Sequence, residues 1–128
     1  MASMRVFITS QDEKLRLALM MFVDKEPGMS VIGMADRLPG LLALLQGSDP
    51  DVLLLDCDFS SRLRTDLLAS LCTLKPRFRT IAFATRAEDE DAILKAGADY
   101  FIAKEAPPDQ LLPILKEIMS SKICGGLY

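Results

Sequence analysis

The sequence predicts an α/β fold: a flavodoxin-like, doubly wound sheet of five parallel strands in the order 2-1-3-4-5. Short apolar runs alternate with segments of helical periodicity, five such pairs follow one another without an internal repeat, and the run at 51–56 is apolar enough to be buried on both faces. Alternating strands and helices joined by right-handed crossovers give a parallel sheet covered on both faces. Five units suit the flavodoxin-like strand order.

Residues typical of helix ends divide the chain into these units. Pro27-Gly28 ends the first predicted helix, Gly97 ends the fourth, and Pro108 opens the last. We expect strands at 5–9, 30–35, 51–56, 80–84 and 100–103, and helices at 12–24, 38–46, 63–73, 88–95 and 108–122. Pro113 lies inside the last predicted helix, where proline costs about 3 kcal/mol and kinks the axis unless it falls within the first turns.

Length and composition indicate one globular domain. The chain has 128 residues, half of them apolar, and therefore enough material for a sizeable core. The absence of histidine excludes imidazole acid/base chemistry, histidine-ligated metals and a phosphohistidine within this chain. A net charge of −3 without a basic stripe argues against nucleic-acid binding by this domain itself.

The cysteines and the apolar runs bear on the cellular compartment. Cys57, Cys72 and Cys124 are odd in number and lack CxxC spacing, so we expect reduced thiols and no disulfide. The N-terminus has no apolar segment of a signal peptide, and no run approaches the roughly 20 apolar residues that span a membrane. We therefore expect a soluble, cytoplasmic protein that does not engage a membrane.

Three polar side chains follow three neighbouring strands of the predicted sheet. Asp56 ends the third strand, Thr85 follows the fourth and Lys104 follows the fifth. The carboxyl ends of parallel strands form the ligand crevice of such sheets, so an acid, a hydroxyl and an ammonium should converge there. A carboxylate can attack phosphorus while a hydroxyl and a cation bind the phosphate oxygens, which suits phosphoryl acceptance. A turn or cap aspartate is the alternative interpretation of Asp56.

Several segments together resemble the receiver domain of bacterial two-component response regulators. They are Asp-Pro-Asp-Val-Leu-Leu-Leu-Asp at 49–56 and Ala-Gly-Ala-Asp-Tyr-Phe-Ile-Ala-Lys at 96–104. The resemblance implies that Asp56 is the phosphoacceptor, that Thr85 and Phe101 are switch residues and that Lys104 is the family's lysine. It also implies a histidine kinase or another signalling protein as partner, and a receiver-like domain over 1–122 with a tail or linker stump at 123–128.

Two further segments, at 31–36 and 104–107, are similar to the LuxR/NarL subfamily, whose receivers precede helix-turn-helix output domains. A DNA-binding output domain in a longer chain is therefore an implication of the resemblance.

The first departure from the family concerns Mg²⁺. Ser10 and Gln11 stand where the family has a pair of acids that hold the metal; sliding the alignment by one residue would bring in Asp12 but spoil the match of the first helix. Mg²⁺ prefers oxygen ligands in octahedral geometry, and a neutral pair offers oxygens without charge. We expect a weak or absent Mg²⁺ site at Asp56, with Asp58 or Asp12 as the substitute carboxylate.

The second departure is Arg86, next to Thr85, where the family has a small residue. Its guanidinium would either block the acceptor pocket or pair with Asp56 in place of the metal; the alternative is a solvated loop arginine. The loop at 57–64 also lacks the family's Pro and Gly, and the segment from Thr85 to Lys104 is shorter than usual by about a helical turn.

Other features allow structural explanations. Met20 and Met21 extend the apolar run of the first helix beyond one buried stripe, which favours either a contact surface, as in a homodimer, or plain core. The acidic run 88–91 suits the start of a helix, where the dipole favours anions.

Two functions remain: a receiver that catalyses its own aspartyl phosphorylation and dephosphorylation, or a degenerate receiver that serves as a phosphorylation-independent interaction module. In either case we expect a signalling domain and not an independent enzyme, because no Gly-rich phosphate loop and no GxSxG motif are present.

Overall fold

One parallel sheet forms the centre of the molecule. The computed structural model describes residues 3–37, 40–58, 61–73 and 78–125, excluding the side chains of 61–65, 108 and 122–125. Within this part of the chain, five strands pair in the order β2-β1-β3-β4-β5, every pairing being parallel. The strands are β1 Met4–Thr9, β2 Met29–Ala35, β3 Val52–Asp56, β4 Arg79–Ala84 and β5 Tyr100–Ala103. The predicted fold class and strand order are confirmed.

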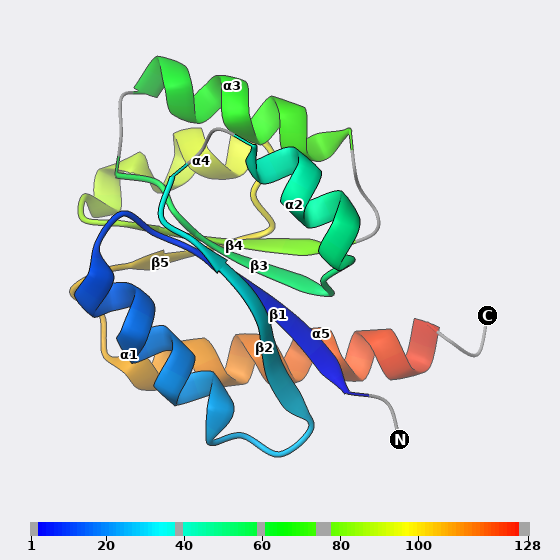
Figure 1. Cartoon of the computed structure of the whole chain (residues 1–128). Helices are drawn as coiled ribbons and strands as arrows, with labels where there is room; N and C mark the ends of the chain where they lie inside the picture. Colours follow the sequence, from blue (N-terminus) through cyan, green and yellow to red (C-terminus); the bar gives the residue numbers. More distant parts are fainter. Residues whose placement is uncertain (1–2, 38–39, 59–60, 74–77, 126–128) are drawn as a thin grey trace.

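Helices cover both faces of the sheet (Figure 1). They are α1 Glu13–Asp24, α2 Leu41–Ser48, α3 Ser61–Cys72, α4 Glu90–Ala96 and α5 Leu111–Gly125, with short 3₁₀ turns η1 Ala87–Asp89 and η2 Pro108–Gln110. Helices α1 and α5 lie on one face, and α2, α3 and α4 lie on the other. This is the arrangement that right-handed crossovers produce in a doubly wound sheet.

The central strand β3 is apolar because it contributes to both layers of the core. Val52 and Leu54 belong to the apolar cluster beneath α1 and α5, whereas Leu53 and Leu55 belong to the cluster beneath α2, α3 and α4. Successive side chains of a strand point to opposite faces, so a strand buried on both faces has no polar positions. Each fully buried leucine contributes roughly 1.5–3 kcal/mol, which holds firmly the strand that carries Asp56.

Two helices, α2 and α5, start three residues later than predicted. Helix α2 begins at Leu41, after the predicted start at 38, because Gly40 takes φ +81° as the residue before the first turn. Residues 108–110 form the 3₁₀ turn, so α5 begins only at Leu111. Pro113 is then the third residue of α5, within the first turn, where backbone amides have no acceptor inside the helix. This is the position at which we expected proline to be accommodated without a kink.

Two helix ends bear on other predictions. Helix α4 ends at Ala96 and is capped by Gly97, as predicted, and it is short. Helix α5 continues to Gly125, past the predicted end at 122, so the predicted tail at 123–128 begins inside a helix; residues 126–128 lie outside the described part. None of the helices, over their described residues, combines the length and apolar character that crossing a membrane requires.

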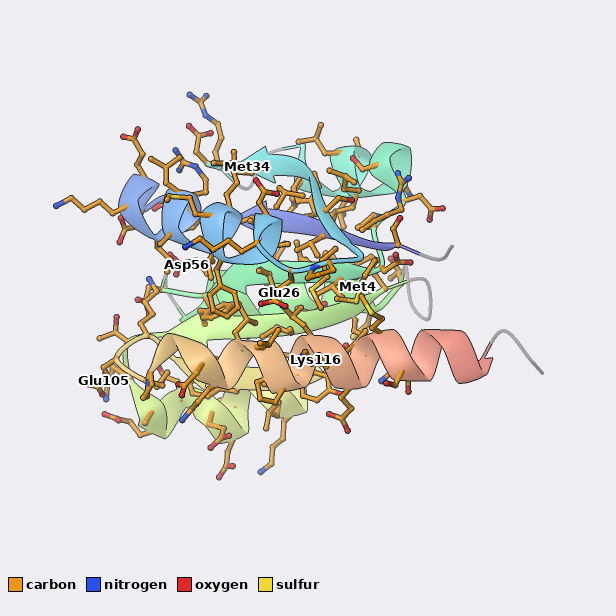
Figure 2. The ribbon with its side chains drawn as sticks, turned by 90° about the horizontal axis from the view of Figure 1, so that it is seen from below. Met4, Glu26, Met34, Asp56, Glu105 and Lys116 are labelled. Carbon is orange, nitrogen blue, oxygen red and sulfur yellow. The ribbon has the colours of Figure 1, made fainter. Side chains whose placement is uncertain are left out.

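The carboxyl ends of the strands gather at one edge of the sheet. In Figure 2, Asp56 and Glu105 lie at this edge, while Met4, which begins β1, lies at the opposite edge. The loops at the carboxyl edge therefore bring together residues that are far apart in the sequence.

Candidate functional site

A cleft of about 280 Å³ opens at the carboxyl edge of the sheet. Residues that follow β1, β2, β3 and β5 line it, together with Thr9 at the end of β1 and Asp56 at the end of β3. The lining residues are Thr9, Ser10, Gln11, Asp12, Asp36, Arg37, Asp56, Asp58 and Lys104. The cleft contains four carboxylates and two cationic groups, so its charge is negative.

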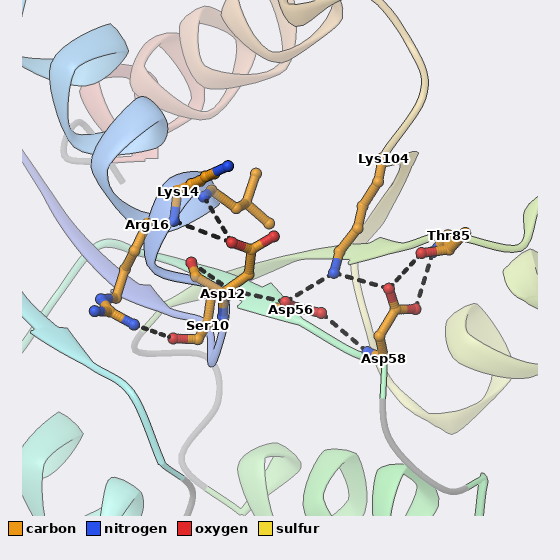
Figure 3. A network of polar contacts seen from close by, with 9 residues as sticks. Ser10, Asp12, Lys14, Arg16, Asp56, Asp58, Thr85 and Lys104 are labelled. Carbon is orange, nitrogen blue, oxygen red and sulfur yellow. Dashed lines mark hydrogen bonds and ion pairs between the residues drawn. The ribbon is translucent and has the colours of Figure 1, made fainter.

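Asp56 is the most buried acid of the cleft, its side chain being 8% exposed. Its Oδ2 accepts hydrogen bonds from Ser10 Oγ at 2.7 Å and from Lys104 Nζ at 2.8 Å. Its Oδ1 accepts a hydrogen bond from the backbone N–H of Asp58 at 3.0 Å. A buried charge requires a charged partner and hydrogen bonds, and Asp56 has both. The carboxylate is thus held in one orientation at the end of β3 (Figure 3).

Lys104 bridges two carboxylates. Its Nζ lies 2.8 Å from Oδ2 of Asp56 and 2.8 Å from Oδ2 of Asp58. The backbone N–H of Lys104 donates to the carbonyl of Ala84 at 2.8 Å, which fixes the start of the loop after β5. Burial lowers the pKa of Lys104, but the hydrogen bonds to Asp56 and Asp58 more than offset that effect, so the pKa lies above its ordinary value of 10.5. The ammonium is therefore charged at neutral pH.

Asp58 joins Thr85 to this pair. Thr85 donates its backbone N–H to Oδ1 of Asp58 at 2.9 Å and its hydroxyl to Oδ2 at 2.6 Å. Burial raises the pKa of Asp58, and the hydrogen bonds from Lys104 and Thr85 outweigh it, so the pKa lies below 3.8. Asp56, Thr85 and Lys104 were predicted to meet at this edge of the sheet. Thr85 is connected to the other two through Asp58.

Sequence reasoning missed this intermediary role of Asp58, having considered the residue only as a metal ligand. One signal was available. Residues i and i+2 of an extended segment project to the same side, so an acid two positions after Asp56 can reach the same groups.

The residues after β1 connect Asp56 to the start of α1. Besides donating to Asp56, Ser10 Oγ accepts the backbone N–H of Asp12 at 3.0 Å. Asp12 is the N-cap of α1, with Oδ1 accepting from the amides of Lys14 at 3.0 Å and Leu15 at 3.4 Å. Gln11 is exposed and lines the cleft. The carboxylate of Asp12 is thus used to start a helix.

The described contact of the Arg86 side chain is with Glu88 and not with Asp56. The Arg86 side chain is 69% exposed and donates from Nε to Oε1 of Glu88 at 3.1 Å, whereas the described partners of the Asp56 carboxylate are Ser10, Asp58 and Lys104. The guanidinium neither covers nor neutralises Asp56 in this arrangement. It corresponds to the solvated loop arginine considered above.

The structure also places Phe101, the expected switch aromatic, and the two methionines of α1. Phe101 is half-buried in β5 and packs against the cluster beneath α2, α3 and α4. Met20 packs against the cluster beneath α1 and α5, whereas Met21 is 58% exposed.

The loop and the cysteines are described only in part. Residues 59–60 of the loop after Asp56 lie outside the described part. Cys57, which is buried, and Cys72, which is exposed, form no disulfide with each other, and the side chain of Cys124 is outside the description.

Comparison with known proteins places this geometry in a family. The family model of the response regulator receiver domain matches residues 6–116. The chain belongs to this family. The receiver is 24% identical over 120 residues to the nitrate/nitrite response regulator protein NarL of Escherichia coli K12, a match that covers 92% of this chain and 56% of NarL. The receiver thus spans about half the length of the curated relative.

Solved receiver structures share its fold. A LuxR-family two-component response regulator from Aurantimonas sp. SI85-9A1 superimposes with a TM-score of 0.81 at 16% identity, covering 94% of this chain and 87% of that one. CheY6 of R. sphaeroides, in a complex with the P1 domain of CheA3, gives a TM-score of 0.77 at 20% identity, over 94% and 99% of the chains. The NarL and LuxR neighbours support the predicted subfamily.

Receiver domains generally bind Mg²⁺, and Ser10 and Gln11, which stand beside Asp56 in place of the family's acids, are neutral. Within the described residues, no three acidic, cysteine or histidine side chains come together in a group able to hold a metal. Both oxygens of Asp56 and of Asp58 already accept hydrogen bonds, and Asp12 caps α1. Mg²⁺ needs near-octahedral oxygen ligands with enough negative charge to displace its waters. A neutral serine and glutamine do not supply that charge.

Proposed function

We propose that this domain is a phosphorelay receiver in which Asp56 accepts a phosphoryl group. The observation that carries the proposal is the contact between Asp56 and Lys104: a carboxylate at the end of β3, facing an open cleft, with an ammonium at 2.8 Å. An aspartate is an established nucleophile in phosphoryl transfer, and a nearby cation stabilises the charge on the transferred group. The receiver fold supports this use of the site.

The transfer forms one bond and breaks another. A carboxylate oxygen of Asp56 attacks the phosphorus of a phosphohistidine on a partner protein, an O–P bond forms, and the P–N bond breaks. The imidazole leaves with the electron pair of that bond, as a neutral ring when its other nitrogen carries a proton. Hydrolysis returns the domain to its starting state: water attacks the phosphorus, the bond between phosphorus and the Asp56 oxygen breaks, and the carboxylate is restored while free phosphate leaves.

The positive charge of Lys104 stabilises the phosphoaspartate product. Its ammonium already contacts Asp56, and a phosphoaspartate carries more negative charge than the aspartate it replaces. Thr85 is the hydroxyl donor for a second phosphoryl oxygen. Its hydroxyl is at present bound to Asp58.

The partner that supplies the phosphoryl group is a histidine kinase or a related histidine-containing protein. The chain has no histidine of its own, so the donor is external. The neighbour CheY6, solved with the P1 domain of CheA3, supports a protein donor of this class. A cytoplasmic setting follows from that role.

The relatives also support further partners. The match covers only 54% of the DNA-binding transcriptional activator DevR/DosR of Mycobacterium tuberculosis, so we extend the proposal to a DNA-binding output domain in a longer protein, with no nucleic acid bound by the receiver itself. The exposed Met21 supports a homodimer contact on α1.

A second function has its own support: a degenerate receiver that binds partners without phosphorylation. Ser10 and Gln11 replace the metal-binding acids, and both Thr85 and Lys104 are already bound to Asp58. The fold would then serve as a scaffold whose surface, rather than its acceptor, carries the signal.

Intact mass after incubation with acetyl phosphate, with and without Mg²⁺, tests the proposal. The receiver should gain one phosphoryl mass, and the Asp56→Asn variant should not. Asp51→Asn, which removes an acid from the opposite edge of the sheet, is the matched control and should still gain the mass. A folded wild-type chain that gains no mass under either condition contradicts the proposal and favours the interaction module.

A further inference from the structure

We infer that the carboxylate of Asp58 occupies the phosphoryl-binding groups of this receiver and must leave them before Asp56 can hold a phosphoryl group. The inference rests on the proposed function only in taking Asp56 as the acceptor. The contacts that carry it are those of Asp58 with Thr85 and Lys104 (Figure 3).

Asp58 presents anionic oxygens where a phosphoryl group would present its own. One oxygen accepts the backbone N–H of Thr85 at 2.9 Å, and the other accepts the Thr85 hydroxyl at 2.6 Å and lies 2.8 Å from Lys104 Nζ. Carboxylate and phosphoryl oxygens recognise the same charged and hydroxyl donors. Asp58 is therefore an internal substitute for the ligand of Thr85 and Lys104.

Asp58 and a phosphoryl group compete for the same hydrogen-bond donor, the hydroxyl of Thr85. A threonine hydroxyl has a single hydrogen to donate, and that hydrogen is directed at Asp58. A phosphoryl oxygen can receive it only after Asp58 has moved. A second cost adds to the first, because the charge of Asp58 would lie beside the charge of the phosphoryl group.

Asp58 is placed so that it can move. Its side chain is 32% exposed, against 8% for Asp56, so water can solvate the released carboxylate. The backbone N–H of Asp58 donates to Oδ1 of Asp56, a contact that does not depend on the side chain. Rotation of the side chain would free Thr85 and Lys104 while the backbone stays beside the acceptor.

Removing Asp58 should change phosphorylation in opposite directions, depending on whether Asp58 competes with the phosphoryl group or binds Mg²⁺. If Asp58 competes with the phosphoryl group, its removal increases phosphate binding and phosphorylation. If Asp58 supplies the carboxylate missing from the Mg²⁺ site, its removal decreases phosphorylation. One variant therefore distinguishes the two roles.

Binding of orthophosphate, followed by NMR at the backbone amides of Thr85 and Lys104, tests the competition without any covalent step. All chains carry Asp56→Asn, so that no acceptor carboxylate repels the anion. Adding Asp58→Ala should lower the apparent Kd for orthophosphate at least about tenfold. Asp58→Asn, which keeps the shape, should give a smaller gain in the same direction. The amide spectra also show whether each variant is folded.

Asp36→Asn is the matched control, because it removes one charge from the rim of the same cleft without a contact to Thr85 or Lys104. If it strengthens phosphate binding as much as Asp58→Ala, or if Asp58→Ala gives no gain, the inference is overturned.

A second experiment tests the inference separately from the proposed function. With Asp56 present, Asp58→Ala should gain the phosphoryl mass from acetyl phosphate faster than the wild type. A slower gain overturns the inference and assigns Asp58 to the metal. Stronger orthophosphate binding by Asp58→Ala with no mass gain in any chain supports the competition between Asp58 and phosphate for Thr85 and Lys104, and counts against Asp56 as acceptor.

Discussion

The hydroxyl of Ser10 donates a hydrogen bond of 2.7 Å to Oδ2 of Asp56 at the position where other receivers hold a metal with an acid. The same oxygen also accepts from Lys104, so a neutral donor and an ammonium together satisfy it. Together with the backbone N–H of Asp58, these donors hold the Asp56 carboxylate in place. The charge balance of the site differs from that of a receiver with a pair of acids.

Restoring the acids should create metal dependence. Ser10→Asp combined with Gln11→Asp places two carboxylates beside Asp56, and like charges at close range oppose folding. Without Mg²⁺ we expect a loss of about 1–3 kcal/mol in the free energy of unfolding. Mg²⁺ should recover it, because a ligand that binds only the native state stabilises that state. Thermal denaturation across a Mg²⁺ titration measures both effects.

The control replaces the same residues by asparagine, which has the shape of aspartate without its charge. A Mg²⁺-dependent rise in Tm for the wild type equal to that of the acidic variant would contradict the expectation that the neutral Ser10 and Gln11 weaken Mg²⁺ binding.

Lys104 should be the main electrostatic support of the site. Lys104→Met keeps most of the side chain's length but leaves Asp56 and Asp58 without their shared cation. A buried charge that loses its partner is costly, and we expect a loss of about 1–3 kcal/mol. Urea denaturation measures it. Adding Asp58→Asn should recover part of the loss, whereas Lys95→Met on the exposed face of α4 should change little.

The fold and part of the site followed from the sequence for physical reasons. The β3 run is apolar because it is buried on both faces, and strands in a parallel sheet end at a common edge, so Asp56 and Lys104 were expected to meet. The contact between Asp58 and Thr85 depends on a loop conformation that no periodic pattern encodes. The start of α5 was misplaced because Pro108 suits the first position of a 3₁₀ turn as well as that of an α-helix.

Stability should respond to acid through Asp58. Its folded-state pKa lies below 3.8, so its contacts contribute stability above about pH 4 and lose that contribution as pH falls through the folded value. Asp58→Asn should therefore differ from the wild type near neutral pH and converge with it in acid. Urea midpoints between about pH 6 and pH 2 measure the difference. A constant difference across that range would show that Asp58 is not responsible.

Lys104 should produce the opposite dependence in base. Its pKa is raised above 10.5, so its contribution is fully present below that pH and is lost as pH rises through the higher folded value. The difference between the wild type and Lys104→Met should accordingly persist to about pH 10 and decrease above it.

Gly97 should be required for the turn from α4 into β5, the strand that leads to Lys104. Its φ is +131°, and a Cβ there would also meet Sγ of Cys72. Gly97→Ala should cost about 1–3 kcal/mol, and Cys72→Ala should relieve only the steric part of that cost. Gly47→Ala is the control: it lies in α2 with open space around it and should gain up to about 1 kcal/mol. Denaturant unfolding measures all of these variants.

Arg86 should not control the acceptor. Its guanidinium pairs with Glu88 in solvent, and exposed ion pairs contribute about 0–1 kcal/mol. Arg86→Ala should therefore leave the phosphoryl mass gain from acetyl phosphate unchanged and shift the unfolding free energy by less than about 1 kcal/mol. Glu88→Gln removes the ion pair but keeps Arg86, so this variant shows whether any effect comes from the loss of the pair or from the guanidinium itself. If Arg86→Ala accelerates the mass gain, the guanidinium blocks the pocket in solution; if it abolishes the gain, the guanidinium takes the place of the metal. An unchanged rate leaves Asp58 as the residue that restricts access to Thr85 and Lys104.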